Sequence, residues 1–233
     1  MTDTQKPAER TSGKEALIAV GLGIVFMAVA LFVQAIVQEI PEYIYLGLHG
    51  FSISLLVSGY STFEFQHPLE FGLYLGLVAA TMQEVAAYVA VDTRTKQYAF
   101  YMGLGFSVVD IIVLMFDTLP VIGRITLFPA LLIVLNVIAS ILFHPGTATF
   151  MKWGRIAGFG KETLGISIFL HAVIDGGVAF LDLWIPFHPS LYVRDSSIYW
   201  AIAMTISVGI FIVGLKKLRN VEESVEREKP VVF

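Results

Sequence analysis

The chain of 233 residues contains no cysteine and little charge, and both absences limit what it can be. Without cysteine it has no disulfide bond, no thiolate metal ligand and no cysteine nucleophile. Charged residues make up 15% of the chain and apolar residues 56%, whereas soluble globular proteins have about 25% and about 45–50%. We therefore interpret the chain as an integral membrane protein, which excludes a water-soluble enzyme domain, a disordered chain and a coiled coil.

A surplus of basic residues is also missing, since the formal net charge is −4. The chain therefore has no electrostatic footprint for a nucleic-acid partner, and we expect its surroundings to be the lipid bilayer of a cell membrane. Three parts are predicted: a polar N-terminal segment over 1–15, a transmembrane helical domain over 16–215 and a charged cytoplasmic tail over 216–233.

Long apolar runs predict an all-α, multi-pass bundle of about seven transmembrane helices. A helix needs about 20 apolar residues to cross the hydrocarbon core, which is about 30 Å thick. The first run is too long for the core of a signal peptide, which has about 7–15 residues. The seven predicted spans are Ala16–Val37, Tyr43–Thr62, Phe71–Val91, Ala99–Met115, Leu127–Met151, Leu164–Leu183 and Ile198–Leu215.

Seven spans would place the two ends of the chain on opposite sides of the membrane. The segments on the side of the C-terminal tail carry ten Lys and Arg, and the segments on the other side carry five. Basic residues concentrate on the cytoplasmic side, so we expect the C-terminal tail in the cytoplasm and the N-terminus outside. Lys6, Arg10 and Lys14, which precede the first span, favour the reverse.

Five titratable residues lie well inside the predicted spans: Glu84, Asp110, His144, His171 and Asp175. Ionisable groups inside a bilayer are costly and commonly mark functional sites. At 1.5 Å per helical residue, each lies roughly 12–21 Å from a charged residue at the cytoplasmic side of its span. Four helices are thus predicted to bring three carboxylates and two imidazoles to similar depth, in one polar pocket.

Each of these residues also has a purely structural interpretation. His171 and Asp175 are four residues apart and share one helix face, which suits a shared metal or water or a carboxylate that holds an imidazole tautomer. Such a pair is equally often a hydrogen-bonded pair without function. His144 precedes Pro145, where a donor can satisfy carbonyls freed by a helix kink. We interpret Gly103-x-Gly105 and Gly176-Gly177 as close-packing sites between helices.

Four short motifs carry a resemblance to a known family. Gln83-Glu84-Val-Ala-Ala-Tyr88 resembles the Glu-Glu-x-x-Arg-Tyr motif of the YhfC-like membrane proteins, and Gly103–Asp110 resembles their Gly-x-Gly-His-Gly-x-x-Glu. Leu142-Phe-His144 is similar to a histidine motif late in the fifth span. His171-Ala-Val-Ile-Asp175 is similar to the His-x-x-x-Asp motif of the wider superfamily of CAAX-processing and PrsW-type intramembrane proteases. The resemblance covers roughly residues 71–183.

The chain departs from the family motifs at several positions. Gln83 replaces the first Glu, Ala87 stands where Arg is expected, and Phe106 stands where YhfC-like proteins have His. Asp110 replaces Glu, and Asn136-Val137 stands where a Glu-Arg pair is expected. Glu84, a carboxylate at 110, His171 and Asp175 remain.

The resemblance implies an intramembrane endopeptidase that hydrolyses a membrane-embedded peptide or protein. Glu84 would be the general base that activates water. His171 would polarise the water or the carbonyl, or bind a metal, and Asp175 would orient it. His144 and Asp110 would complete either a hydrogen-bond network or the ligand shell of a zinc ion held by His144, His171, Asp110 and Glu84. Metal-assisted and metal-free catalysis both stay open, as does an oligomeric assembly.

Two other classes of function stay open. One is a catalytically silent scaffold or binding protein of the same superfamily, which the substitutions at Gln83, Ala87 and Phe106 favour. The other is a small transporter in which the same carboxylates relay protons or cations, although the inverted repeat typical of transporters is not found. A retinal-binding receptor is a poor fit, since the last predicted span has no lysine in its interior.

Overall fold

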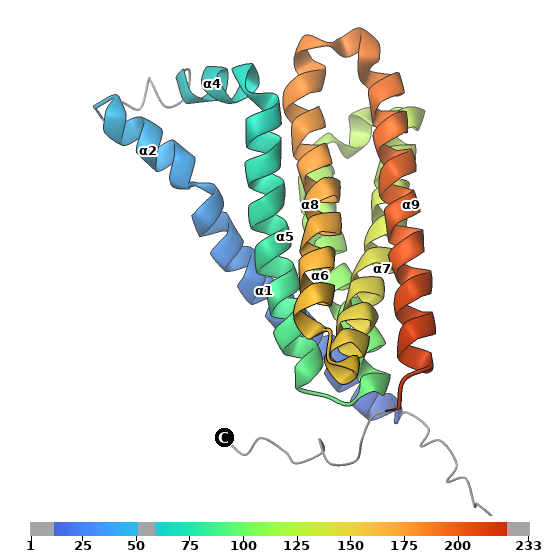
Figure 1. Ribbon diagram of the computed structural model, residues 1–233. Coiled ribbons are helices and arrows are strands. Elements are labelled where there is room, and N and C mark those ends of the chain that lie inside the picture. Colours follow the sequence, from blue (N-terminus) through green and yellow to red (C-terminus); the bar gives the residue numbers. More distant parts are fainter. Residues whose placement is uncertain (1–11, 51–58, 223–233) are drawn as a thin grey trace, which may run out of the picture.

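The computed structural model describes residues 12–50 and 59–222, and within them the chain is helical, with no β-strand. The long helices are α1 (Gly13–Gln38), α5 (Pro68–Asp92), α6 (Ala99–Thr118), α7 (Leu127–Ala157), α8 (Gly160–Trp184) and α9 (Tyr192–Arg219). Two shorter helices, α2 (Ile40–Leu48) and α4 (Ser61–Gln66), lie near one end of the bundle (Figure 1). The prediction of an all-α polytopic membrane bundle is confirmed.

Six helical segments of the described residues are long and apolar enough to cross a membrane, where seven were predicted. The difference lies in the predicted span Tyr43–Thr62. Helix α2 ends at Leu48, and Gly50 follows with φ +81°, which ends the helical path. Nine residues of helix extend about 14 Å, too short to cross the membrane. Residues 51–58 of that predicted span lie outside the described residues.

With six spans, the start of α1 and the end of α9 lie at the same end of the bundle (Figure 1). The Tyr98 hydroxyl donates a hydrogen bond to Glu15 near the start of α1, and the Lys96 ammonium donates one to the carbonyl of Val221 just after α9. The prediction of the two ends on opposite sides is therefore wrong for these described ends. An even number of spans returns the chain to the side of the membrane on which it started, whereas seven spans would not.

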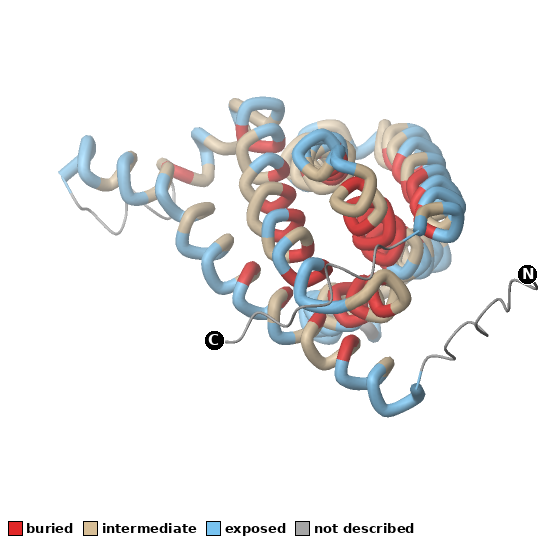
Figure 2. The backbone as a smooth tube through the Cα atoms, turned by 60° about the horizontal axis from the view of Figure 1, so that its bottom comes forward, coloured by how far each residue is buried: buried red, intermediate tan, exposed pale blue. Residues whose placement is uncertain are grey.

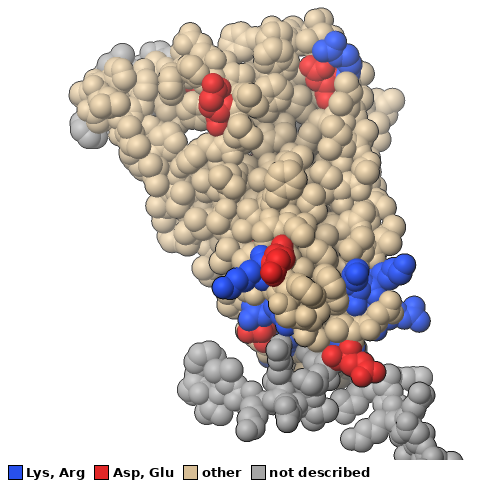
Figure 3. Space-filling view, viewed as in Figure 1, with Lys and Arg blue, Asp and Glu red and all other residues tan. Residues whose placement is uncertain are grey.

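Basic side chains gather at this shared end, called the basic end below (Figure 3). It carries nine Lys and Arg of the described residues: Lys14, Arg94, Lys96, Lys152, Arg155, Lys161, Lys216, Lys217 and Arg219. The opposite end carries two of them, Arg124 and Arg194. Lys14, which opposed the predicted orientation, now belongs to the richer side.

The outer faces of the long helices are exposed, and the buried residues form inward stripes (Figure 2). Phe32, Leu73 and Ile212 expose more than half of their surface although they are large and hydrophobic. In water such a belt would aggregate, so these faces fit contact with lipid. The chain is therefore a multi-pass membrane protein.

Glycines set the helix contacts that position the polar residues of the interior. A Cβ added at Gly76 of α5 would lie 2.4 Å from the Cα of Gly176 in α8, and one at Gly103 of α6 would lie 2.4 Å from the Cα of Pro145 in α7. Helices approach this closely only where side chains are absent. The close-packing interpretation of Gly103 and Gly176 is confirmed, and the two contacts bring α5 to α8 and α6 to α7.

Candidate functional site

The α5–α8 contact joins Glu84 to His171. Glu84 is fully buried and His171 nearly so, and His171 Nδ1 lies 2.8 Å from Glu84 Oε1, within hydrogen-bond distance. The two residues are separated by 87 positions in the chain. Their contact depends on the approach of Gly76 to Gly176, which lie about two turns and about one turn away along their respective helices.

The second ring nitrogen of His171 faces another carboxylate. Nε2 lies 3.3 Å from Asp175 Oδ2, which confirms that the two residues share one face of α8. Asp175 is one-third exposed, so the line Glu84–His171–Asp175 runs from the closed interior to an accessible carboxylate. An imidazole between two carboxylates can pass a proton from one to the other by changing its tautomer.

A second imidazole–carboxylate pair lies beside the first. His144 Nε2 of α7 is 3.6 Å from Asp110 Oδ2 of α6, which is an electrostatic contact longer than a good hydrogen bond. The rings of His144 and His171 are 5.4 Å apart between centroids, at 72°. The structure thus brings together all five residues that the sequence placed at one depth.

Aromatic rings close the space around the two histidines. The ring of Phe143 is 4.8 Å from that of His171, and the ring of Phe106 is 5.9 Å from that of His144. Phe106 and Phe143 thus form an apolar wall beside the two imidazoles. The polar cluster is enclosed on these sides by side chains that neither titrate nor form hydrogen bonds.

Several buried oxygen atoms in this region have no hydrogen-bond partner among the described residues. They include the second carboxylate oxygen of Glu84, Oε2, and the hydroxyl of Ser167. An unpaired polar atom at such depth costs about 1–3 kcal/mol, and more for a charged group. A purely structural role gives no reason for this cost, whereas a water or a reacting group at Oε2 would offset it.

Sequence reasoning did not include the serines of this region. Ser167 lies one helical turn before His171, and Ser140 lies one turn before His144. Ser107 of α6 donates a hydrogen bond of 2.8 Å to the carbonyl of Ser140 and ties the second pair of helices together. The spacing of four residues from each histidine is the signal that could have found them.

A cavity of about 380 Å³ lies between the halves of four helices that are farther from the basic end, and it is called the four-helix cavity below. It is lined by Leu114 of α6, by Asn136 of α7 and by Val178 of α8, among others. Leu114 is one turn from Asp110, and Val178 is about one turn from Asp175. The two partly exposed carboxylates therefore lie next to its inner end.

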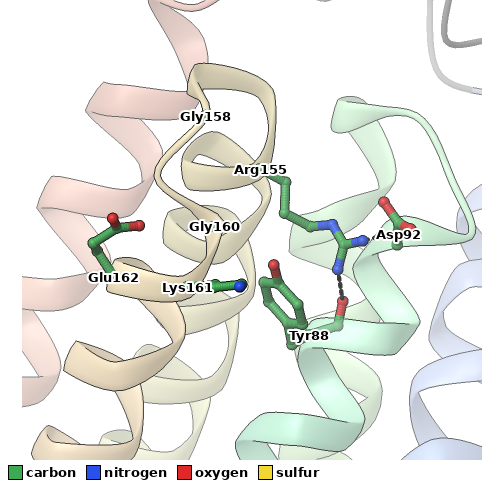
Figure 4. Close-up of a pocket in the computed structure, with 7 residues that line it drawn as sticks. All are labelled: Tyr88, Asp92, Arg155, Gly158, Gly160, Lys161 and Glu162. Carbon is green, nitrogen blue, oxygen red and sulfur yellow. Dashed lines mark hydrogen bonds and ion pairs between the residues drawn. The ribbon is translucent and has the colours of Figure 1, made fainter.

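A second cavity, of about 340 Å³, opens at the basic end between α5 and the turn that joins α7 to α8 (Figure 4). Arg155 crosses it: its guanidinium lies 2.6 Å from Asp92, donates to the carbonyl of Tyr88 at 3.1 Å and stacks over the Tyr88 ring. Tyr88 follows Glu84 by one turn of α5. The line Glu84–His171–Asp175 thus has one cavity toward the basic end of the bundle and another toward the opposite end.

The four predicted zinc ligands lie in two pairs, His144 with Asp110 and His171 with Glu84. Within residues 12–50 and 59–222, no three His, Asp or Glu side chains are grouped around one position for an ion. The reason is the geometry of His171, because both ring nitrogens face carboxylates and leave no lone pair directed toward a shared centre. Without His171, the predicted ligand set contains a single nitrogen ligand, His144, beside Asp110 and Glu84.

Comparison of the chain with protein-family models, with curated proteins and with solved structures finds no match.

Proposed function

We propose that this protein is an intramembrane hydrolase that cleaves a peptide bond of a membrane-embedded substrate. One observation carries the proposal: a fully buried carboxylate, Glu84, is held at one oxygen by His171 and leaves its other oxygen without a protein partner. A general base needs this arrangement, with one atom fixed by the protein and one atom aimed at the water to be activated.

The chemistry follows from the positions of the side chains. Glu84 Oε2 takes a proton from water, and the water oxygen attacks the carbonyl carbon of the substrate. The carbonyl electron pair moves to its oxygen, which an N–H of His144 stabilises, and the Asp110 carboxylate lies 3.6 Å from Nε2 of the same ring. The C–N bond then breaks as Glu84 returns the proton to the amine. Asp175 acts as a positioning residue because it holds the ring of His171.

Substrate reaches the reacting groups by the four-helix cavity. Asp110 and Asp175 are 37% and 33% exposed, so the accessible side of the cluster is the side that borders this cavity, and the buried Glu84 is approached from that side. Its walls include Leu114 and Val178 and suit an apolar membrane segment. The order of the four motifs, which resembles that of intramembrane proteases, supports the same substrate class.

The orientation is part of the proposal. Nine of the Lys and Arg described lie at the basic end and two at the opposite end, so the positive-inside bias assigns the basic end to the cytoplasmic side of a cell membrane. Both described helix termini then face the cytoplasm. Two variants test this placement, one with a single cysteine at Gly13 and one with a single cysteine at Gly123, at the opposite end of the bundle. Each cysteine is labelled with a membrane-impermeant reagent in intact cells.

The hydrolase is tested with purified protein in liposomes that also contain a library of apolar membrane peptides. New peptide termini are identified by mass spectrometry for the wild type, Glu84→Gln and Glu162→Gln. We expect the wild type and Glu162→Gln, which changes an exposed glutamate of α8, to produce the same new termini. Glu84→Gln should produce none, and full cleavage by this variant would overturn the assignment of the base.

One observation favours a second candidate, a proton relay across the membrane. The charge line Glu84–His171–Asp175 has a cavity about one turn from each of its ends, one open toward the basic end and one toward the opposite end. Such a line can carry protons without any bond cleavage. Proton flux into liposomes that is lost in Asp175→Asn, together with an absence of cleaved peptides, would select the relay and exclude the hydrolase.

A further inference from the structure

The four-helix cavity has a lining that the proposed hydrolysis does not use. Beyond its inner end it is bordered by the carboxylate of Asp182 and by three aromatic residues, Tyr192, Tyr199 and Trp200. From these groups we infer that the outer part of the cavity is a binding site for an organic cation that carries a quaternary ammonium group. The inference does not depend on the proposed hydrolysis, because it concerns binding alone.

The charge of the lining selects a cation. Asp182 is its one ionisable acid, and no Lys, Arg or His belongs to the lining. Arg194, the nearest basic residue in sequence to the cavity residues of α9, is committed to Asp195 at 2.8 Å. A carboxylate near the membrane interface without a basic partner in its own cavity produces a negative potential there, and apolar walls strengthen this potential because they screen charge poorly.

The remaining lining excludes a metal ion and selects an organic cation. Calcium takes about six to eight oxygen ligands, and magnesium about six, whereas the polar side chains of this cavity are one carboxylate, the amide of Asn136 and the hydroxyls of Ser196 and of the two tyrosines, of which the carboxylate alone is a charged ligand. Aromatic faces beside a carboxylate are the lining that recognises quaternary ammonium groups. The volume of about 380 Å³ falls within the range of about 300–1,000 Å³ that is typical of small-molecule sites.

The aromatic rings are held in place before any ligand binds. The hydroxyl of Tyr199 donates a hydrogen bond of 2.9 Å to the carbonyl of Ile174, and its ring lies against Gly177, where a Cβ would be 2.5 Å from the ring. Trp200 is buried and packs edge-on to Tyr199 at 5.1 Å, and Tyr192 packs edge-on to Phe128. Rings fixed in advance bind without loss of rotamer freedom, which is the advantage of a preorganised site.

Helical register explains how the site forms. The cavity residues of α9, Tyr192, Ser196, Tyr199 and Trp200, lie along one face of that helix, and those of α8, Val178, Leu181 and Asp182, lie along one face of α8. The end of α8 and the start of α9 are joined by two short 3₁₀ turns, Ile185–Phe187 and Pro189–Leu191, so both faces meet at the end opposite the basic end. An ammonium group here would lie near the interface, while its hydrocarbon could extend inward along the leucines.

Two sources share this chemistry: a choline lipid headgroup and a free organic cation. The test measures binding of radiolabelled choline to the full-length protein in nanodiscs of phosphatidylglycerol, which lacks an ammonium group. Its neutral isostere, 3,3-dimethylbutan-1-ol, is the competitor that keeps the shape and removes the charge. We expect choline to bind saturably and the isostere to compete at least about tenfold more weakly.

Variants assign the binding to the cavity. Asp182→Asn should weaken choline binding by about tenfold or more, and Tyr192→Leu by about threefold or more. Asp117→Asn is the matched control, because it changes an exposed aspartate near the same end of the bundle that does not line the cavity, and it should bind choline normally. Thermal unfolding of each variant verifies folding, and Asp182→Glu keeps the test decisive if Asp182→Asn unfolds.

Binding of the isostere as tight as that of choline, or unchanged binding by both Asp182→Asn and Tyr192→Leu, would overturn the inference. Nanodiscs that contain phosphatidylcholine distinguish the two sources of the ligand. Loss of choline binding in them would identify the lipid headgroup as the occupant, and unchanged binding would identify a soluble cation. Peptide cleavage is not used as a readout, so a failure of the proposed hydrolysis leaves this result unaffected.

Discussion

Replacement of Gly76 by alanine tests whether the α5–α8 contact holds the reacting groups together. The added Cβ would lie 2.4 Å from the Cα and from the amide nitrogen of Gly176, and 2.7 Å from the carbonyl oxygen of Ala172. All three atoms belong to the backbone, so no side chain can rotate away. An ordinary contact needs about 3.4 Å, so the helices must separate by about 1 Å at this point.

Such overpacking costs about 1–3 kcal/mol, which lowers the Tm by about 2–12 °C for a chain of this length. The same separation stretches the 2.8 Å contact of Glu84 with His171 toward the limit of a hydrogen bond, so peptide cleavage should fall together with stability. Thermal unfolding in detergent measures the first effect. The nitrogen chemical shifts of His171 in protein labelled at histidine measure the second.

Gly165→Ala is the matched control, since Gly165 lies on α8, the helix that Gly76 contacts, and no atom lies within 4 Å of its added Cβ. It should leave both the Tm and the shifts of His171 near the wild-type values. Equal effects of Gly76→Ala and Gly165→Ala would refute the reasoning, because the contact at Gly176 would then not position His171.

Three further outcomes are expected. Arg155→Gln removes the contacts with Asp92 and Tyr88. Because Arg155 and Asp92 are both partly exposed, the Tm should fall by a few degrees at most, and by less in high salt. An equal fall of the Tm in low and in high salt would contradict this prediction. Ser167→Ala removes a buried hydroxyl without a partner among the described residues, so the Tm should stay or rise, and a lower Tm would contradict its unpaired state. Burial raises the pKa of Glu64 in α4 above its usual 4.5. The contribution of Glu64 to stability is therefore present at lower pH and is lost as the pH rises through the raised pKa. Glu64→Gln should flatten this part of the Tm–pH curve, and an unchanged curve would contradict the prediction.

The depth of the polar residues could be predicted from the sequence, because a helix advances by a constant rise and apolar runs mark the membrane. Glu84, Asp110, His144, His171 and Asp175 were placed at one level in this way, and the structure brings them together. The pairing of Glu84 with His171 could not be predicted, since it depends on the approach of Gly76 to Gly176 across two helices that are distant in the chain.

The sides of the membrane were less predictable than the helices. One apolar run, Tyr43–Thr62, was counted as a span, and this single error reversed the placement of the start of the first helix. Residue counts cannot reveal that Gly50 adopts a positive φ and ends α2 after nine residues. Nor can they reveal that both nitrogens of His171 face carboxylates.

The central claim is that Glu84, with one oxygen held by His171 and one oxygen free, activates water for peptide hydrolysis. Cleavage of membrane peptides in water enriched in ¹⁸O tests it most directly, with mass spectrometry of the new C-terminal carboxylates. The wild type should place one ¹⁸O atom in each new carboxylate, and Glu84→Gln should yield no new carboxylate. Unlabelled new termini, or labelled termini at equal yield from Glu84→Gln, would contradict the account.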